Sequence, residues 1–264
     1  MNLDRVIAVR TQKTVYKDGE ESVKVFGGEY SAADVLSEAL CLARAAEAGI
    51  RVPEVRAVEK TDGRWAIVTE YIDGQTADAL MKAYPEKRKE YLGKLVRLQI
   101  SVHEKACGLL PRLTDKIGRG IALAKSYGAD GAALDALVST LPEKNCFCHG
   151  DFNPTNAVFT EEGEEYLLDF SHAAAGDPLT DAAITYLYFY LREGERAAEE
   201  YLKIFLAESG AGEAEEKKRL PLAAAVWLLR ANEEEKEKLL PFLKNAAETA
   251  ETAKTGGNAK AVKK

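Results

Sequence analysis

Residues 149–156 read HGDFNPTN and residues 166–170 read YLLDF, and these two stretches decide how the rest of the chain is interpreted. The first lacks strong helix formers and is rich in residues that favour turns, so it predicts an irregular loop after the apolar stretch at 146–148. This loop carries a histidine, an aspartate and two asparagines, which is unusual for a simple connection. Because functional side chains concentrate on loops held by a rigid scaffold, we expect a functional site here.

Three oxygen-bearing side chains in these stretches have the chemistry of a metal site with a proton acceptor. Asp151 and Asn156 lie at opposite ends of the loop, and Asp169 ends the apolar strand that is predicted just before it. Mg²⁺ typically takes one or two carboxylate or amide oxygens from the protein and fills its other positions with phosphates and water. Asn156 and Asp169 are the expected metal ligands, which leaves Asp151 to accept a proton from a hydroxyl. The alternative for Asp151 is a structural turn residue.

The same residues carry a family resemblance. The HGD of the loop, its closing Asn156 and the later LLDF resemble the catalytic loop and metal-binding aspartate of the protein-kinase-like superfamily, in the form typical of the aminoglycoside phosphotransferase and choline kinase-like family. Residues 176–181, GDPLTD, match the segment that follows the metal aspartate in that family. The resemblance implies an α+β, bilobal protein-kinase-like fold, with a small β-rich N-terminal lobe that has one helix and a larger, mainly helical C-terminal lobe.

The N-terminal pattern is compatible with such a lobe. Two turn signals, Asp18-Gly19 and Asp62-Gly63, separate runs of alternating apolar residues. These runs predict strands at 6–9, 14–17, 22–26, 55–58 and 65–69.

A helix is expected after the third of these strands. Ser31 is its predicted N-cap, and its apolar stripe runs to about Ala48. The resemblance implies that Lys24, on the strand, neutralises nucleotide phosphates, and that Glu38, on the helix, holds Lys24 by an ion pair. The alternative is a solvated strand lysine and a solvated helix glutamate.

The resemblance also implies where a nucleotide base binds. Residues 69–72 match the family's connector between the lobes, which suggests the carbonyl of Glu70 and the amide of Ile72 as adenine partners, with Thr69 as the gate residue. The first predicted hairpin contains no G-x-G-x-x-G, so its phosphate contacts are unassigned and the choice between ATP and GTP stays open. The residue after Asp169-Phe170 is not glycine, so an activation segment controlled by phosphorylation is not indicated.

Beyond the connector the chain is predominantly helical. Helical periodicity predicts helices at 76–83, 85–107, 114–127, 132–141, 180–192, 195–209, 221–231 and 233–252. Short strands are expected at 146–148, 156–159 and 164–169. The expected domains are a nucleotide-binding lobe with its hinge at 1–72, a helical lobe with the catalytic loop and substrate site at 73–252, and a flexible tail at 253–264.

Composition and charge indicate which classes of binding partner are disfavoured. The 264 residues carry a net charge of −7, which does not favour binding to nucleic acid. The N-terminus does not read as a signal peptide, and the apolar run at 220–229 is about half the ~20 residues that a membrane span needs. A cytoplasmic protein with no membrane partner is expected. Its four cysteines should be reduced, with Cys146 and Cys148 as buried strand thiols rather than metal ligands.

Several other polar residues have supporting roles in this prediction. His149 is expected to hold the catalytic loop, and His103 to be a satisfied core histidine. His172 is expected to have a structural or substrate-rim role rather than to bind metal. Asp177 and Asp181 are expected to cap the helix near residue 180 and to brace the loop.

The predicted function is that of an ATP- and Mg²⁺-dependent small-molecule kinase, which transfers the γ-phosphoryl group to a substrate hydroxyl. The alternatives are an atypical Ser/Thr protein kinase and a non-catalytic nucleotide-binding module of the same fold. The lack of an arginine before Asp151 counts against the first, and the presence of Lys24, Asp151, Asn156 and Asp169 counts against the second. The acidic runs of the helical part are interpreted as solvated faces. The phosphate acceptor and the oligomeric state stay open.

Overall fold

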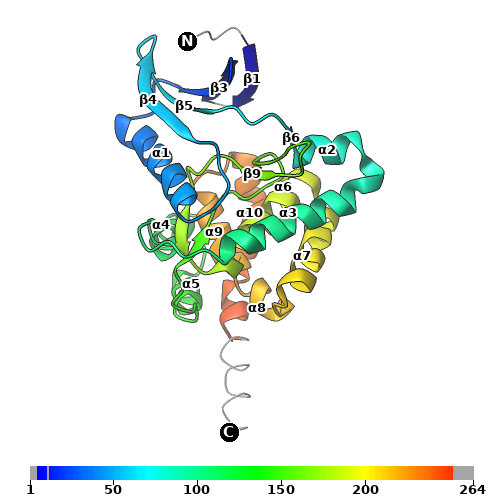
Figure 1. Ribbon diagram of the computed structural model, residues 1–264. Coiled ribbons are helices and arrows are strands. Elements are labelled where there is room, and N and C mark those ends of the chain that lie inside the picture. The colour runs from blue at the N-terminus through cyan, green and yellow to red at the C-terminus, as the bar shows by residue number, and fades with distance from the viewer. Residues whose placement is uncertain (1–4, 11, 252–264) are drawn as a thin grey trace. The chain divides into compact units, whose positions relative to one another are not determined.

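An antiparallel sheet forms the N-terminal part of the protein (Figure 1). The computed structural model describes residues 5–10 and 12–251, and within them five strands pair in the order β1-β2-β3-β5-β4. The predicted turn at Gly19, where φ is +59°, joins β2 to β3, and the turn at Asp62 and Gly63 joins β4 to β5. The strands are β1 (Arg5–Arg10), β2 (Lys13–Asp18), β3 (Glu21–Phe26), β4 (Val55–Thr61) and β5 (Arg64–Glu70).

Alternation along β3 decides which side chains face the helix. Val23 and Val25 pack with residues of β5 in one buried cluster, whereas Phe26 packs with residues of helix α1 (Ala32–Glu47) in another. Because successive side chains of a strand point to opposite faces, Lys24 lies on the same face as Phe26, toward α1.

Helix α1 begins where the sequence predicts. The Ser31 hydroxyl accepts a hydrogen bond from the amide of Asp34, and the Asp34 carboxylate accepts one from the Ser31 amide, which completes a capping box. The helix ends before Gly49, whose φ of +77° suits a residue without a side chain.

The described chain divides into two compact units. The first takes in the residues up to Tyr91 together with Pro154–Ala173, and the second takes in Leu92–Asn153 and the residues from Ala174 onward. In the first unit, β6 (Gln75–Thr76), β8 (Ala157–Phe159) and β9 (Glu165–Leu167) pair in a second sheet. These units differ from the predicted boundary after residue 72, which stays a prediction, and the predicted tail at 253–264 lies outside the described residues.

Two further helical segments of the first unit come directly after β6. They are α2 (Ala77–Ala83), which Thr76 caps, and the 3₁₀ turn η1 (Pro85–Lys87). Helix α3 (Arg88–His103) continues into the second unit.

The second unit is a helical core with one small strand pair. Helix α9 (Leu220–Leu228) is buried along its whole length and packs against α4, α6 and α10. Strand β7 (Cys146–Cys148) pairs with β10 (Ala174–Gly176). The other helices are α4 (Leu113–Lys125), α5 (Gly131–Val138), α6 (Pro178–Glu193), α7 (Glu195–Ser209), α8 (Glu213–Lys217) and α10 (Glu233–Lys244).

Several predicted helices end earlier in the structure: the one expected over 132–141 ends at Val138, and the one expected over 221–231 ends at Leu228. The helix expected over 85–107 begins with η1 and ends at His103, because the next residues pair with the start of β7. The Phe147 amide donates to the Lys105 carbonyl at 2.7 Å, and the Cys107 amide donates to the Asn145 carbonyl at 3.0 Å. The helix expected over 233–252 is interrupted at Asn245: α10 ends at Lys244, and residues 246–251 are helical again.

Two short strands were not expected from the sequence. The two-residue β6 and the three-residue β10 are too short for a periodic signal, and both depend on distant partners. None of the helices in the described ranges has both the length and the apolar character needed to span a bilayer.

Candidate functional site

A chain of ion pairs connects the sheet, helix α1 and the segment after β9 within the first unit. The ammonium group of Lys24, on β3, lies 2.5 Å from Oε1 of Glu38, on α1, and 3.1 Å from Oδ1 of Asp169. The other oxygen of Glu38, Oε2, lies 2.9 Å from Nζ of Lys13, on β2. The structure therefore brings three predicted site residues together and adds Lys13.

The neighbouring charges shift the pKa values of Lys24 and Asp169. Burial alone would lower the pKa of Lys24, but the charges of Asp169 and then Glu38 outweigh burial and raise it. Burial alone would raise the pKa of Asp169, but Lys24 and then Lys13 hold it well below its ordinary value. Lys24 is therefore cationic and Asp169 anionic across the physiological range.

Asp169 has an unusual backbone conformation. Its φ is +60°, in the left-handed region that residues other than glycine seldom adopt. Ser171 donates a hydrogen bond from Oγ to Asp169 Oδ1 at 2.9 Å, so Oδ1 receives both this bond and Lys24. Strained backbone that the surroundings hold in place is a feature of functional sites.

Asn156, the second predicted metal ligand, lies next to this segment. Its carbonyl accepts a hydrogen bond from the amide of Leu168 at 2.8 Å, which joins the start of β8 to the residue before Asp169. Asn156 is buried. The ladder between β8 and β9 thus keeps the two predicted ligands on neighbouring segments.

The predicted base-binding connector follows β5. The Thr69 hydroxyl donates to the Glu70 carbonyl at 3.2 Å, which uses one of the two lone pairs of that oxygen. The Glu70 amide donates to the Glu54 carbonyl at 2.9 Å, and the Tyr71 amide to the Glu20 carbonyl at 2.9 Å. The Ile72 amide makes no hydrogen bond within residues 12–251, so it is available to an acceptor.

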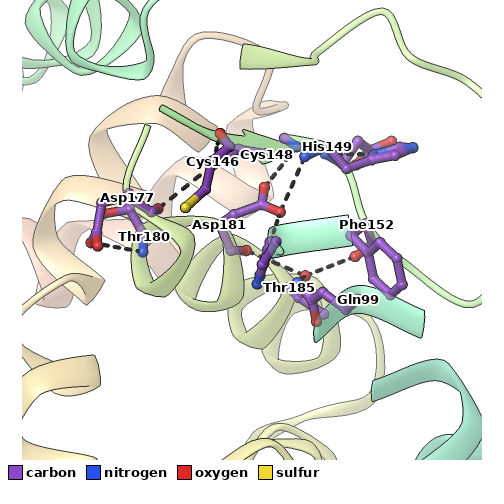
Figure 2. A network of polar contacts seen from close by, with 12 residues as sticks. Gln99, Cys146, Cys148, His149, Phe152, Asp177, Thr180, Asp181 and Thr185 are labelled. Carbon is purple, nitrogen blue, oxygen red and sulfur yellow. Dashed lines mark hydrogen bonds and ion pairs between the residues drawn. The ribbon is translucent and has the colours of Figure 1, made fainter. Parts of the chain in front are cut away.

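In the second unit, Asp181 anchors the start of the HGD loop (Figure 2). Its carboxylate accepts hydrogen bonds from the amides of His149, at 3.1 Å, and Gly150, at 2.7 Å, and lies 2.9 Å from His103 Nε2. Burial would raise the pKa of Asp181, but its contact with His103, with the Gly150 amide as a further contribution, outweighs burial and lowers this pKa. Gly150 has a φ of +74°, which glycine adopts without strain. The structure confirms the bracing role expected of Asp181.

A buried hydrogen-bond network supports the next part of the loop. The Thr185 hydroxyl donates to the Phe152 carbonyl at 3.0 Å and accepts from Gln99 Nε2 at 2.9 Å, as Figure 2 shows. The Tyr201 hydroxyl donates to Gln99 Oε1 at 2.7 Å. Together with Asp181, these three side chains from α3, α6 and α7 therefore fix the backbone on both sides of Asp151.

Asp177 caps α6, as predicted. Its carboxylate accepts from the Thr180 amide and also lies 3.1 Å from Nε of Arg219, a buried partner that the sequence reasoning did not identify. Cys148 is buried and its thiol donates to the Asp177 carbonyl at 3.7 Å. Of the two cysteines predicted to be buried strand thiols, Cys148 is buried on β7, whereas Cys146, at the start of the same strand, is only half-buried.

Asp151 lies in the second unit with a cationic neighbour. Its amide donates to Nδ1 of His149 at 3.2 Å, and His149 packs edge-on against Phe152, which agrees with a loop-holding role for that histidine. Its carboxylate Oδ1 lies 3.0 Å from Nη2 of Arg230, and the exposed fraction of the Asp151 side chain is 26%. Asp151 is therefore partly open to solvent and paired with an arginine that the sequence reasoning missed.

The residues that were missed gave only weak signals. Lys13 lies two residues before Val15, whose partner across the ladder is Lys24, so its face follows from strand alternation once the register is known. Arg230 follows the apolar run of α9, and a charged residue just after a buried helix is common and does not by itself indicate a site. Neither position belongs to a motif, and both pairings join residues far apart in the chain.

Comparison with known proteins gives a consistent result. The sequence profile of the phosphotransferase enzyme family matches residues 6–218. Among curated proteins, none matches the sequence. Similar solved structures include an aminoglycoside-3'-phosphotransferase of type VIII, with 20% identity, a TM-score of 0.63 and coverage of 85% of this chain and 93% of that one.

Two further structures show the same fold. A thermostable mutant of aminoglycoside phosphotransferase APH(4)-Ia, in ternary complex with AMP-PNP and hygromycin B, has 18% identity, a TM-score of 0.65 and 92% coverage of each chain. A choline/ethanolamine kinase family protein from Mesorhizobium loti has 16% identity, a TM-score of 0.61 and coverage of 96% of this chain and 87% of that one.

Proposed function

We propose that this chain, which belongs to the phosphotransferase enzyme family and is therefore a kinase that acts on an alcohol group, uses ATP and Mg²⁺ to phosphorylate a small molecule. The observation that carries the proposal is the placement of Lys24 between Glu38 and Asp169. A lysine held by one carboxylate and next to a second is the arrangement that phosphoryl transfer uses to neutralise phosphates and to place a metal ion.

The residues of the first unit fit Mg²⁺. Asp169 Oδ1 is engaged by Lys24 and Ser171, whereas Oδ2 has no hydrogen bond to any of the described residues. An ionised carboxylate with one oxygen available is a suitable donor for a hard cation, and an asparagine oxygen is a second. We propose Asp169 and Asn156 as the metal ligands. Bound there, Mg²⁺ would neutralise charge on the nucleotide phosphates.

The adenine base is proposed to bind the connector after β5. The available lone pair of the Glu70 carbonyl and the available amide of Ile72 supply an acceptor and a donor, and Thr69 lies beside them. AMP-PNP is bound in one neighbouring structure and AMP in another, which supports an adenine nucleotide.

Asp151 is the proposed catalytic residue on the acceptor side. As the acceptor oxygen bonds to the γ-phosphorus and the bond to the departing ADP breaks, the hydroxyl proton passes to the Asp151 carboxylate. The amides that Asp181 holds and the Phe152 carbonyl that Thr185 holds keep Asp151 in one orientation. Positioning of this kind supplies a large part of the acceleration in a reaction with a loose transition state.

The acceptor is proposed to be a small molecule. The printed names of the neighbouring proteins refer to aminoglycosides, hygromycin B and choline or ethanolamine. Their folds do not choose among substrates, because one fold serves many acceptors.

The test is an assay of ADP release over a panel of hydroxylated metabolites, with the wild-type protein and the Asp151→Asn variant. We expect the variant to lose about 10²–10⁴-fold in kcat, the contribution of a general base, and to keep its affinity for ATP. Mg²⁺-dependent thermal stabilisation by ATP, with GTP in parallel, measures nucleotide binding separately. Equal turnover by Asp151→Asn would contradict the role of Asp151, and the absence of any nucleotide-dependent stabilisation would contradict the kinase proposal.

A further inference from the structure

Arg230 places a positive charge directly on the proposed catalytic carboxylate. Its Nη2 atom lies 3.0 Å from Asp151 Oδ1, and both side chains are partly exposed, by 22% and 26%. A hydroxyl that approaches Asp151 closely enough to give up its proton must therefore also come close to the guanidinium group. The acceptor molecule that carries this hydroxyl therefore binds next to the positive charge of Arg230.

The guanidinium group of Arg230 packs on an aromatic ring of α9. Its Cζ atom lies 4.4 Å from the centre of the Trp227 ring, on α9, and Trp227 is buried. The Arg230 amide donates to the Trp227 carbonyl at 3.0 Å, which fixes the turn that follows the helix. A cation stacked on a buried ring keeps a fixed plane, which favours recognition of a planar, two-oxygen group.

The donors of Arg230 are only partly used. Nη2 is shielded from solvent and, although it lies within ion-pair distance of Asp151, it has no well-aligned hydrogen bond within residues 12–251. A guanidinium group has five N–H donors, and shielded donors are normally satisfied. The arrangement thus favours a ligand that supplies acceptor oxygens.

Acidic residues close in sequence are engaged elsewhere. Glu235 accepts from the Asn232 amide and lies 2.7 Å from Nη2 of Arg192. Glu233 and Glu234 pair with Lys236 and Lys238. Within the described ranges, Asp151 is the carboxylate that lies within ion-pair distance of Arg230.

We propose that the phosphate acceptor carries an oxyanion, a carboxylate or a phosphate monoester, close to the hydroxyl that is phosphorylated, and that Arg230 binds it. This inference rests on the proposed function and narrows its substrate class. Arg230 forms charge-assisted hydrogen bonds to the oxyanion while Asp151 faces the hydroxyl. A cationic acceptor is disfavoured, because its charge would lie next to that of Arg230.

Binding of unreactive probes tests this separately from catalysis. Malonate represents a carboxylate and methyl phosphate represents a phosphate monoester, and neither has a hydroxyl to phosphorylate. Calorimetric titration is done with AMP-PNP and Mg²⁺ present, so that the cations proposed to bind nucleotide phosphates are occupied. We expect the wild-type protein to bind at least one probe, and Arg230→Gln to weaken that binding by about ten- to a hundredfold.

A matched control is Arg192→Gln, which removes a half-exposed arginine of the same unit that pairs with Glu235. This variant should bind the probes as the wild type does. Arg230→Lys keeps the charge without the planar fork and should bind with intermediate affinity, so it decides the question if Arg230→Gln does not fold. The preference between malonate and methyl phosphate distinguishes a carboxylate acceptor from a phosphorylated one.

Two results would overturn the proposal. One is that the wild type binds neither probe. The other is that both Arg230 variants bind them as tightly as the wild type, as expected if Arg230 only positions Asp151. Turnover on the metabolite panel gives an independent measurement, because a best acceptor that is cationic or neutral would also contradict an oxyanion site. Failure of the proposed function would instead appear as absence of ADP release with probe binding intact.

Discussion

At the scale of single residues, Lys13 changes the electrostatics of the candidate nucleotide site. It shares Glu38 with Lys24, and it also contributes to lowering the pKa of Asp169. The chain has no glycine-rich turn between β1 and β2 that could surround phosphates with backbone amides. Lys13 is the first residue of β2 and supplies an ammonium group, which can replace part of the phosphate binding that such backbone amides would provide.

We therefore predict that Lys13→Met weakens ATP binding, with a rise of about tenfold in the KM for ATP and a smaller change in kcat. The reason is that a charge next to the phosphates stabilises the bound nucleotide before and during the reaction. Steady-state kinetics with varied ATP measure this effect. Lys60→Met is the control, since Lys60 lies on β4 over the Trp65 ring, whereas the ion pairs of Glu38 are with Lys13 and Lys24. An unchanged KM in Lys13→Met would show that Lys13 does not contact phosphate.

At the scale of secondary-structure elements, α4 packs directly against the backbone of α9 at Gly120. A Cβ atom at this position would lie 2.2 Å from the carbonyl oxygen of Ala225. Backbone cannot move aside as the end of a flexible side chain can, so the two helices would have to separate. Helix α9 is buried along its whole length and packs against α6, whose Asp181 and Thr185 hold the backbone on both sides of Asp151.

Gly120→Ala should accordingly destabilise the protein, by about 1–3 kcal/mol, as expected for overpacking in a dense core. Gly118, on the same helix, has nothing within 4 Å of the position of a Cβ atom. Gly118→Ala should stabilise the protein by up to about 1 kcal/mol, because alanine is the better helix former. Denaturant unfolding of both variants measures the difference. The same sign for the two substitutions would show that helix propensity, not packing, decides at Gly120.

At the scale of the whole molecule, one buried acid links stability to pH. Glu216, on α8, is fully shielded, and neither of its carboxylate oxygens has a hydrogen-bond partner among the described residues. Burial, and then the charge of Glu199, raises the pKa of Glu216 from 4.5 to about 8. Between these two values the folded state binds more protons than the unfolded state. The free energy of unfolding therefore decreases as pH rises from 4.5 to about 8.

Glu216→Gln should remove this dependence. The neutral amide resembles the protonated acid, so the variant should match the wild type near pH 4.5 and exceed its free energy of unfolding above pH 8, by a few kcal/mol on the order of the shift in pKa. Denaturant unfolding at a series of pH values measures this. Glu237→Gln, at an exposed position of α10, should follow the wild-type curve. Parallel curves for wild type and Glu216→Gln would mean that Glu216 stays ionised in the folded protein.

Much of the local structure could be predicted from neighbouring residues alone. Ser31 with Asp34 defines the start of α1, and the glycines at positions 19 and 63 define the two hairpin turns. Such features depend on interactions within a few residues, so a short stretch of sequence contains all the information they need. The residue types of the HGD loop likewise indicated a metal site with a proton acceptor, and its family resemblance implied phosphoryl transfer.

The partners of the site residues depended on tertiary structure. That Lys13 shares Glu38 with Lys24 requires the β2–β3 register and the packing of α1 on the sheet. That Arg230 lies on Asp151 requires the end of α9 to meet a loop that lies far away in the sequence. The end of α3 at His103 likewise depends on β7. Sequence by itself determined which chemical groups this protein carries and the local backbone that presents them. Tertiary structure decided which charges became neighbours, because ion pairs between distant residues form only after the packing of the core has set their separation.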